Sequence, residues 1–248
     1  WGFSNEPILF EDKVIVDCDS KGDSFLIALN RETGETFWRV DRTNKGISYS
    51  APLIREMAGR LQMIQCGDRC VTSFDPRTGK ELWTVDGPSE EFAGTPVYSE
   101  KTGFVYLSSS WPKRHLLAIR PDGTGNVTDT HIVWREQRLA PYVPSMIVAG
   151  DYLLGVSNSG FAFCFNPATG ELYWQERLGM HHASPVLING LVYLINDDGQ
   201  INVIKPGPEF ELVATYELGE PCYASPAISN GQVFLRGFEH MFCFGNKL

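Results

Sequence analysis

A nine-residue segment recurs along this chain and restricts the folds that the chain can adopt. NRETGETFW at residues 30–38 returns as DPRTGKELW at 75–83 and as NPATGELYW at 166–174. The first two copies lie 45 residues apart, and the third follows after 91 residues, close to two further periods. Self-similarity at a period of about 20–50 residues is the signature of repeat architectures. The chain is therefore predicted to be an array of similar units.

A second marker, a proline early in each unit, gives the number of units. A drifted copy of the first motif fills the gap between the second and third copies, where 117–123 leads through a longer loop to Trp134. The proline positions are spaced by 45, 44, 49, 40 and 41 residues. They are Pro7, Pro52, Pro96, Ser145 (as Pro144-Ser145), Pro185 and Pro226. The predicted units are about 1–43, 44–88, 89–137, 138–179, 180–219 and 220–248.

Each unit has the pattern of four strands. Apolar residues alternate with a period of two in KVIV at 13–16, FVYL at 104–107 and LVYL at 191–194, which indicates strands. Strand a lies at the proline, strand b at the alternating run, strand c before the Thr-Gly turn, and strand d carries the Trp. Four-stranded units of this length are typical of β-propeller blades. We predict an all-β fold, with residues 1–248 as one propeller domain of six antiparallel blades.

The turn between strands c and d has a predictable geometry. An Asn or Asp opens the turn and can accept a hydrogen bond from the backbone two residues on, and the glycine takes the left-handed conformation. Four residues later, a wide Trp ring can cover the gap between neighbouring blades. We predict a structural, blade-docking role for Gly34, Gly79, Gly170, Trp38, Trp83, Trp134 and Trp174.

Charge and hydropathy exclude several classes of function. Asp and Glu number 30 against 21 Lys and Arg, so the formal net charge is -9 and the field of the protein repels phosphate backbones. No stretch approaches the roughly 20 apolar residues of a membrane span. The first residues lack the pattern of an export signal. We expect no nucleic-acid partner and no membrane span in this chain.

The six cysteines do not form a disulfide framework, because none are adjacent or spaced Cys-x-x-Cys. Only Cys66 and Cys70 are close in sequence. They could bracket a hairpin turn as a disulfide or as half a metal site, but two buried thiols are the commoner arrangement.

The turn motif resembles the pyrroloquinoline-quinone-like (PQQ-like) repeat, and the resemblance spans essentially the whole chain. The residues that carry it are a small or apolar residue, the Asx-x-x-Thr-Gly turn and the Trp, at 28–38, 73–83 and 164–174. The family includes quinoprotein dehydrogenases and non-enzymatic propellers, such as the outer-membrane β-barrel assembly lipoprotein and other exported bacterial proteins. The motif serves blade packing in both groups. The resemblance implies a periplasmic or otherwise extracytoplasmic location and a ring of seven or eight blades.

The last unit is one strand short. Residues 241–245 match strand c, and 246–248 are too few to supply strand d. Closure removes exposed strand edges, and the N-terminal segment of a propeller commonly supplies a missing outer strand. We expect residues upstream of Trp1 to complete this blade and to add one or two more. The alternatives are closure with a three-stranded blade, or edge pairing with another molecule.

One face of a propeller carries the candidate binding residues, because the d-to-a and b-to-c connections emerge there around the channel. Three positions before each proline marker lie Ser4, Tyr49, Ala93, Tyr142, His182 and Tyr223. Four of these six residues carry an aromatic or imidazole ring. The rings could stack on a flat ligand, a sugar or a peptide side chain, or plug the channel mouth. The ligand-binding candidates are Tyr49, Tyr142, His181, His182, Tyr223, Arg69 and Arg236. Most other charged residues of the b-to-c loops, including Asp17, Asp19 and Asp197, are expected to be solvated turn residues.

No motif identifies an active site. DCDSKGD at 17–23 superficially suggests a calcium loop but lacks the spacing and the terminal Glu of an EF-hand. His181 and His182 are adjacent, and neighbouring strand residues point to opposite faces, so they are poorly placed to share a metal. The chain has no nucleophile elbow and no glycine-rich phosphate loop. We predict no catalytic residue and no metal site.

Three functions are compatible with these residues. The first is a non-enzymatic binding or scaffold propeller without a cofactor, which binds a protein partner or a small ligand on its channel face. The second is a dehydrogenase that uses PQQ with calcium, but such relatives carry adjacent cysteines beneath the quinone and this chain has no Cys-Cys pair. The third is carbohydrate binding through Tyr49, Tyr142 and Tyr223.

Overall fold

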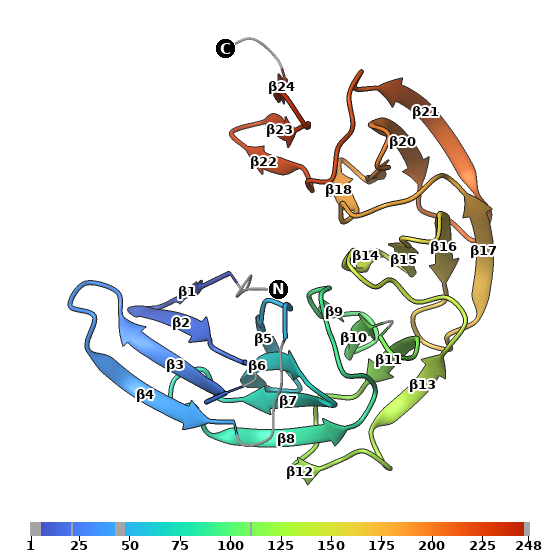
Figure 1. The fold of residues 1–248 in the computed structure, drawn as a ribbon. Helices are drawn as coiled ribbons and strands as arrows, with labels where there is room; N and C mark the ends of the chain where they lie inside the picture. The colour runs from blue at the N-terminus through green and yellow to red at the C-terminus, as the bar shows by residue number, and fades with distance from the viewer. Residues whose placement is uncertain (1–5, 21, 43–47, 110, 246–248) are drawn as a thin grey trace. The chain divides into compact units, whose positions relative to one another are not determined.

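The computed structural model describes residues 6–20, 22–42, 48–109 and 111–245, and every regular element in these ranges is a β-strand (Figure 1). The strands form six sheets. The chain divides into two compact units, residues 1–142 and 143–248. The part of the chain that the structure describes contains no helix of the length and apolarity that a bilayer crossing requires. The prediction of an all-β fold is confirmed.

The first unit contains three sheets, each built from strands that follow one another along the chain. The first sheet consists of β1 (Ile8–Phe10), β2 (Lys13–Asp17), β3 (Phe25–Asn30) and β4 (Thr36–Asp41). The second consists of β5 (Leu53–Met57), β6 (Arg60–Gly67), β7 (Cys70–Phe74) and β8 (Glu81–Asp86), with the short β12 (Gly125–Asn126) at its edge. The third consists of β9 (Val97–Ser99), β10 (Phe104–Ser109), β11 (His115–Ile119) and β13 (Ile132–Glu136).

The second unit repeats this arrangement. The fourth sheet consists of β14 (Ile147–Ala149), β15 (Tyr152–Val156), β16 (Phe161–Phe165) and β17 (Leu172–Arg177). The fifth consists of β18 (Val186–Ile188), β19 (Leu191–Ile195), β20 (Gln200–Lys205) and β21 (Glu211–Glu217). The sixth has three strands among the described residues, β22 (Ala227–Ser229), β23 (Gln232–Arg236) and β24 (Met241–Phe244). Residues 246–248, like Trp1 and Ser4, lie outside the described residues.

The outer strand pair of each four-stranded blade has the same irregularity. Strands c and d are antiparallel, and their register shifts by one residue immediately after the residue that faces the Trp position. The resulting pairs are Ala28 with Trp38, Ser73 with Trp83, Ala118 with Trp134, Cys164 with Trp174 and, in the fifth sheet, Val203 with Ala214. The fifth sheet thus keeps the backbone geometry of the repeat without its Trp.

The turns between strands c and d adopt the predicted geometry. Asn30 accepts hydrogen bonds at its Oδ1 from the backbone of Glu32 at 2.8 Å and of Thr33 at 3.0 Å. Asp75 and Asn166 accept the equivalent bonds in their own turns. The turn glycines have φ values of 76°, 72° and 74° at Gly34, Gly79 and Gly170, in the left-handed region that glycine adopts without steric cost.

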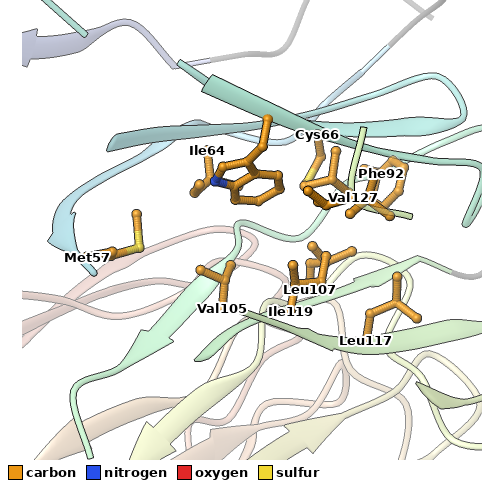
Figure 2. Close-up of a cluster of buried hydrophobic side chains, with 12 residues drawn as sticks. Met57, Ile64, Cys66, Phe92, Val105, Leu107, Leu117, Ile119 and Val127 are labelled. Atoms are coloured by element: carbon orange, nitrogen blue, oxygen red, sulfur yellow. The ribbon is translucent and has the colours of Figure 1, made fainter. Parts of the chain in front are cut away.

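Apolar clusters lie between successive sheets within each unit. The largest joins the second and third sheets, and Figure 2 shows it through side chains such as Ile64, Val105 and Leu107. Similar clusters join the first sheet to the second, the fourth to the fifth, and the fifth to the sixth. The second sheet takes part in two of these clusters, with the first sheet and with the third, and its strand β7 is buried throughout.

Three of the tryptophans lie at these junctions. The Nε1 of Trp38 donates to the carbonyl oxygen of Pro76, in the c-to-d turn of the next sheet, at 3.1 Å. Trp174 donates in the same way to Gly207 at 3.0 Å. Trp83 is fully buried and donates to Gln62 Oε1 at 2.8 Å. Trp134 is half-buried, with its ring 5.8 Å from that of Tyr106.

The long loop that interrupts the third blade contains an element that the sequence pattern did not predict. β12 pairs in parallel with β8, so that Gly125 faces Trp83 and Asn126 faces Thr84. The Nδ2 of Asn126 also donates to Asp86 Oδ2. The loop therefore extends the second sheet by a fifth strand.

Cys66 and Cys70 are free thiols on either side of the β6–β7 turn, and both are fully buried. Burial raises the pKa of the Cys66 thiol, so the residue stays protonated. The interpretation as two buried thiols is therefore confirmed.

Candidate functional site

The connections that carry the candidate residues leave each sheet at one end. In an antiparallel order a-b-c-d, the b-to-c and d-to-a loops lie at the same end, opposite to the a-to-b and c-to-d turns. We call this end of a sheet the loop end. Each unit brings some of the predicted residues together there.

In the first unit, Tyr142 and Tyr49 converge on Glu91, a residue of the loop between β8 and β9. The Tyr142 hydroxyl donates to Glu91 Oε2 at 2.6 Å, and burial and this carboxylate raise the pKa of Tyr142 to about 12. Burial and Glu91 also raise the pKa of Tyr49, whose hydroxyl is buried and has no hydrogen-bond partner among the described residues. The cluster is thus two neutral phenols beside one carboxylate.

Arg69 lies at the tip of the β6–β7 turn, with a φ of 54°. Its guanidinium donates to the carboxylate of Glu90 and lies 3.7 Å from that of Asp68. The side chain is exposed, so these contacts orient it on the surface and stabilise the fold little.

In the second unit, His182 lies between Asp197 and Tyr223. The Nδ1 of His182 is 2.9 Å from Asp197 Oδ2, and the backbone N–H of His182 donates to Asp197 Oδ1 at 3.0 Å. The rings of His182 and Tyr223 are 5.5 Å apart at an interplanar angle of 80°, an edge-to-face contact. Asp197 therefore fixes the imidazole, and the imidazole supports the tyrosine ring.

Tyr223 and Arg236 also border a surface cavity. Its volume is about 460 Å³, and it is lined by Tyr223, Ala224, Arg236, Gly237 and Phe238. Tyr223 is 53% exposed and Phe238 71% exposed. An aromatic pair and a guanidinium thus surround a hollow at the loop end of this unit.

His181 has a different environment from its neighbour. Its side chain is fully buried, and burial lowers its pKa to about 4, so the imidazole is neutral at physiological pH. It lies in the core of the second unit and does not face the cavity of Tyr223.

The loop at 17–23 holds a buried ion pair. Asp19 Oδ1 accepts from Arg42 Nε at 2.7 Å, and Asp17 accepts from the Gln65 amide and from the Asp19 backbone. The expectation of solvated turn residues is wrong for Asp17 and Asp19, which are 4% and 2% exposed. The Arg42 guanidinium binds Asp19 where a calcium loop would need carboxylates free to converge on a cation.

Among the described residues, one group of three side chains has metal-ligand proximity: Glu220, Glu239 and His240. The Glu220 carboxylate accepts from the backbone N–H groups of Glu239 and His240 and lies 2.8 Å from His240 Nδ1. These bonds make Glu220 a cap for the β23–β24 loop. Calcium takes six to eight oxygen ligands, so two carboxylates and an imidazole on an exposed loop do not fit it.

Glu91 and Phe238 belong to these clusters and are examples of residues that were not among the sequence candidates. Both lie in connections at the loop end, one before strand a and one after strand b, at positions not marked by the repeat. The signal in the sequence was a large apolar residue in an otherwise polar loop for Phe238, and none for Glu91.

Comparison with known proteins agrees with the repeat and the sheet order. The family described as outer membrane protein assembly factor BamB matches residues 2–176. The chain belongs to this family. A search of curated proteins finds no match.

Solved structures show the same fold at low identity. BamB from Moraxella catarrhalis superposes with a TM-score of 0.72 at 18% identity, over 96% of this chain and 70% of that one. Quinohemoprotein alcohol dehydrogenase from Comamonas testosteroni gives a TM-score of 0.66 at 10% identity, over 94% of this chain and 51% of that one. The computationally designed protein Ika8 gives 0.68 at 10% identity, over 98% and 70%. The six sheets of this PQQ-like repeat protein are therefore β-propeller blades.

Proposed function

We propose that this protein is a non-enzymatic scaffold that binds a protein partner outside the cytoplasm and needs no cofactor. The observation that carries the proposal is the loop end of the second unit, where exposed Tyr223, Phe238 and Arg236 border one cavity. Aromatic residues and arginine are enriched in protein interfaces and among their energetic hot spots. The membership in a family described as an assembly factor supports the same function.

The contacts that hold the Tyr223 ring in place favour a binding role over a catalytic one. The His182 imidazole is held by Asp197 and packs its edge against the tyrosine, so the aromatic surface is pre-organised. A ring already held in place loses less conformational entropy on binding than a mobile one.

Photo-crosslinking tests this proposal. A photoreactive aromatic residue replaces Tyr223 in the exported protein, and the same residue replaces Asn189, exposed on the a-to-b turn at the opposite end of the fifth sheet. We expect a discrete protein adduct from position 223 that Phe238→Ala and Arg236→Ala weaken. Equal adduct yields from positions 223 and 189 would contradict the proposal.

The dehydrogenase alternative receives less support from these residues. In that chemistry a calcium ion polarises the quinone, and this ion needs several converging oxygen ligands. Asp19 is paired with Arg42, and Glu220 caps a loop backbone. The dehydrogenase from Comamonas testosteroni also extends well beyond the 51% of its length that this chain covers.

The three tyrosines that carbohydrate binding would use lie in different environments. Tyr223 is exposed, whereas the Tyr142 hydroxyl is bonded to Glu91 and the Tyr49 hydroxyl is buried. A glycan array probed with wild type and with the triple alanine variant at 49, 142 and 223 tests this function. If the protein is a scaffold, no glycan on the array should bind the wild type and lose that binding in the triple variant.

A further inference from the structure

In each of the first four sheets, strand d carries a tryptophan beside the register shift. Strand d of the fifth sheet has no tryptophan there. Ala214 faces Val203 beside the register shift, in the place where Trp38 faces Ala28. The junction between the fifth and sixth sheets is therefore built on the repeat pattern with a methyl group where the pattern has a ring.

The residues around this position correspond one by one to the surroundings of Trp38. Trp38 packs in an apolar cluster of the first and second sheets. The strand registers give the equivalent positions in the fifth and sixth sheets. The pairs are Ile15 and Tyr193, Leu26 and Ile201, Val40 and Tyr216, Met63 and Val233, and Phe74 and Phe244.

A cavity lies between the fifth and sixth sheets at this junction. Its volume is about 450 Å³, and all five counterparts from the fifth and sixth sheets line it, together with Ile188 and Leu235. Phe74 is 1% exposed beside Trp38, but its counterpart Phe244 is 46% exposed, and Tyr216 is 58% exposed. The apolar walls of this cavity are open to solvent, in part because β24 is an edge strand among the described residues whereas β7 is an inner strand.

The chemistry of the cavity selects its occupant. Apolar cavities of sufficient size bind aromatic rings, since such rings gain dispersion contacts that water cannot replace. The rim carries the carboxylate of Glu217, which accepts from Gln200 at 3.0 Å, and the chain has a formal charge of -9. This charge favours a ligand in which basic residues flank the ring.

We propose that this cavity binds a tryptophan side chain presented by a basic segment of a partner protein. The ring would occupy the place of the repeat's own indole, delivered by a second chain instead of by β21. This inference shares with the scaffold function only the idea of a protein partner. The site lies on the facing sides of two sheets and not on the loop end, so either proposal can fail while the other stands.

The test uses the 248-residue chain with labelled methyl groups and two peptides, acetyl-Lys-Trp-Lys-amide and acetyl-Lys-Ala-Lys-amide. We expect saturable NMR shifts of the Ile188, Ile201 and Val233 methyls with the tryptophan peptide alone. One ring on a short peptide is expected to bind with a Kd on the order of 1 mM. Absent shifts at these methyls, or equal shifts with the alanine peptide, would overturn the proposal.

Variants of β21 locate the site. Ala214→Trp restores the repeat's ring and is expected to weaken peptide binding at least tenfold. Ala214→Met fills part of the cavity and serves if the indole prevents folding. Leu212→Trp is the matched control, because Leu212 pairs with Ile204, which packs toward the fourth sheet. Wild-type affinity in both Ala214 variants would also overturn the proposal.

Discussion

In the first unit, two carboxylates share a buried environment with one guanidinium. Asp19 bonds directly to Arg42, whereas Asp17 accepts from the amide of Gln65. Burial and the adjacent Asp19 carboxylate raise the pKa of Asp17 to about 7. The ion pair therefore stabilises Asp19 in its charged form and leaves Asp17 as the residue that titrates near neutrality.

This arrangement predicts how stability depends on pH. An aspartate in an unfolded chain titrates near pH 3.9, so between about pH 4 and pH 7 the folded chain keeps a proton that the unfolded chain releases. The free energy of unfolding should fall through that window as pH rises, by about 1.4 kcal/mol for each unit of pKa difference. Asp17→Asn should remove this fall.

Urea unfolding at pH 5 and pH 8 measures the effect, with Asp23→Asn on the exposed part of the same loop as the control. Asp23→Asn should keep the wild-type pH dependence. The same pH dependence in wild type and Asp17→Asn would show that Asp17 is not the responsible group.

The turn glycines give a second prediction, because two of them differ only in their neighbours. A Cβ at Gly79 would lie 2.8 Å from the Trp38 ring and 2.8 Å from Val40 Cγ2, whereas a Cβ at Gly34 would meet none of the described residues within 4 Å. Gly34→Ala should cost about 1–2 kcal/mol of left-handed strain. Gly79→Ala should cost about 1–3 kcal/mol more, because it overpacks the junction. Equal losses in chemical denaturation would mean that the junction adapts without cost.

At the scale of elements, Trp38, Trp83 and Trp174 each lie in an apolar cluster that joins one sheet to the next. Trp83 is fully buried in the cluster of the second and third sheets and donates a hydrogen bond to Gln62 Oε1. The Gln62 amide in turn donates to the carbonyl oxygen of Pro121, in the long loop of the third blade. The indole therefore joins two sheets both by packing and by a hydrogen-bond chain.

Truncation of this ring should lower stability more than any other Trp change. Trp83→Ala is expected to cost about 3–5 kcal/mol, whereas Trp134→Ala should cost less because that ring is half-buried. Thermal unfolding of both variants compares the two positions. A larger loss from Trp134→Ala would contradict this order.

The strands were predictable because their information is local. A period of two, an Asx turn and a left-handed glycine each depend on a few adjacent residues, and they recur in register. β12 was not predictable, since its pairing with β8 joins residues about forty positions apart and Gly125-Asn126 has no alternating pattern. The same limit applies to Asp19, whose burial depends on Arg42 from the next connection.

The candidate site was likewise predictable only in part. The rings of Tyr223 and His182 were found by their fixed distance from the proline marker, and they do lie together. Glu91 and Phe238 became visible only in the folded loops, because loop conformation is not set by the repeat. His181 was separated from His182 by burial, which a pair of adjacent residues in the sequence does not reveal.

At the scale of the whole molecule, the family membership and the blade order describe a propeller whose repeats serve packing, with chemistry left to the loops. The same architecture occurs in an assembly factor and in a dehydrogenase, so fold alone does not assign a task. The loop ends of this chain carry bonded carboxylates and exposed aromatic rings, which is why we propose a binding role.

A titration of the protein with PQQ and calcium, followed by absorbance and by dye-linked alcohol oxidation, distinguishes a binding propeller from a dehydrogenase. We predict no saturable change in the quinone spectrum and no turnover above the protein-free control. A saturable spectral change with alcohol-dependent dye reduction would contradict it and establish the dehydrogenase function.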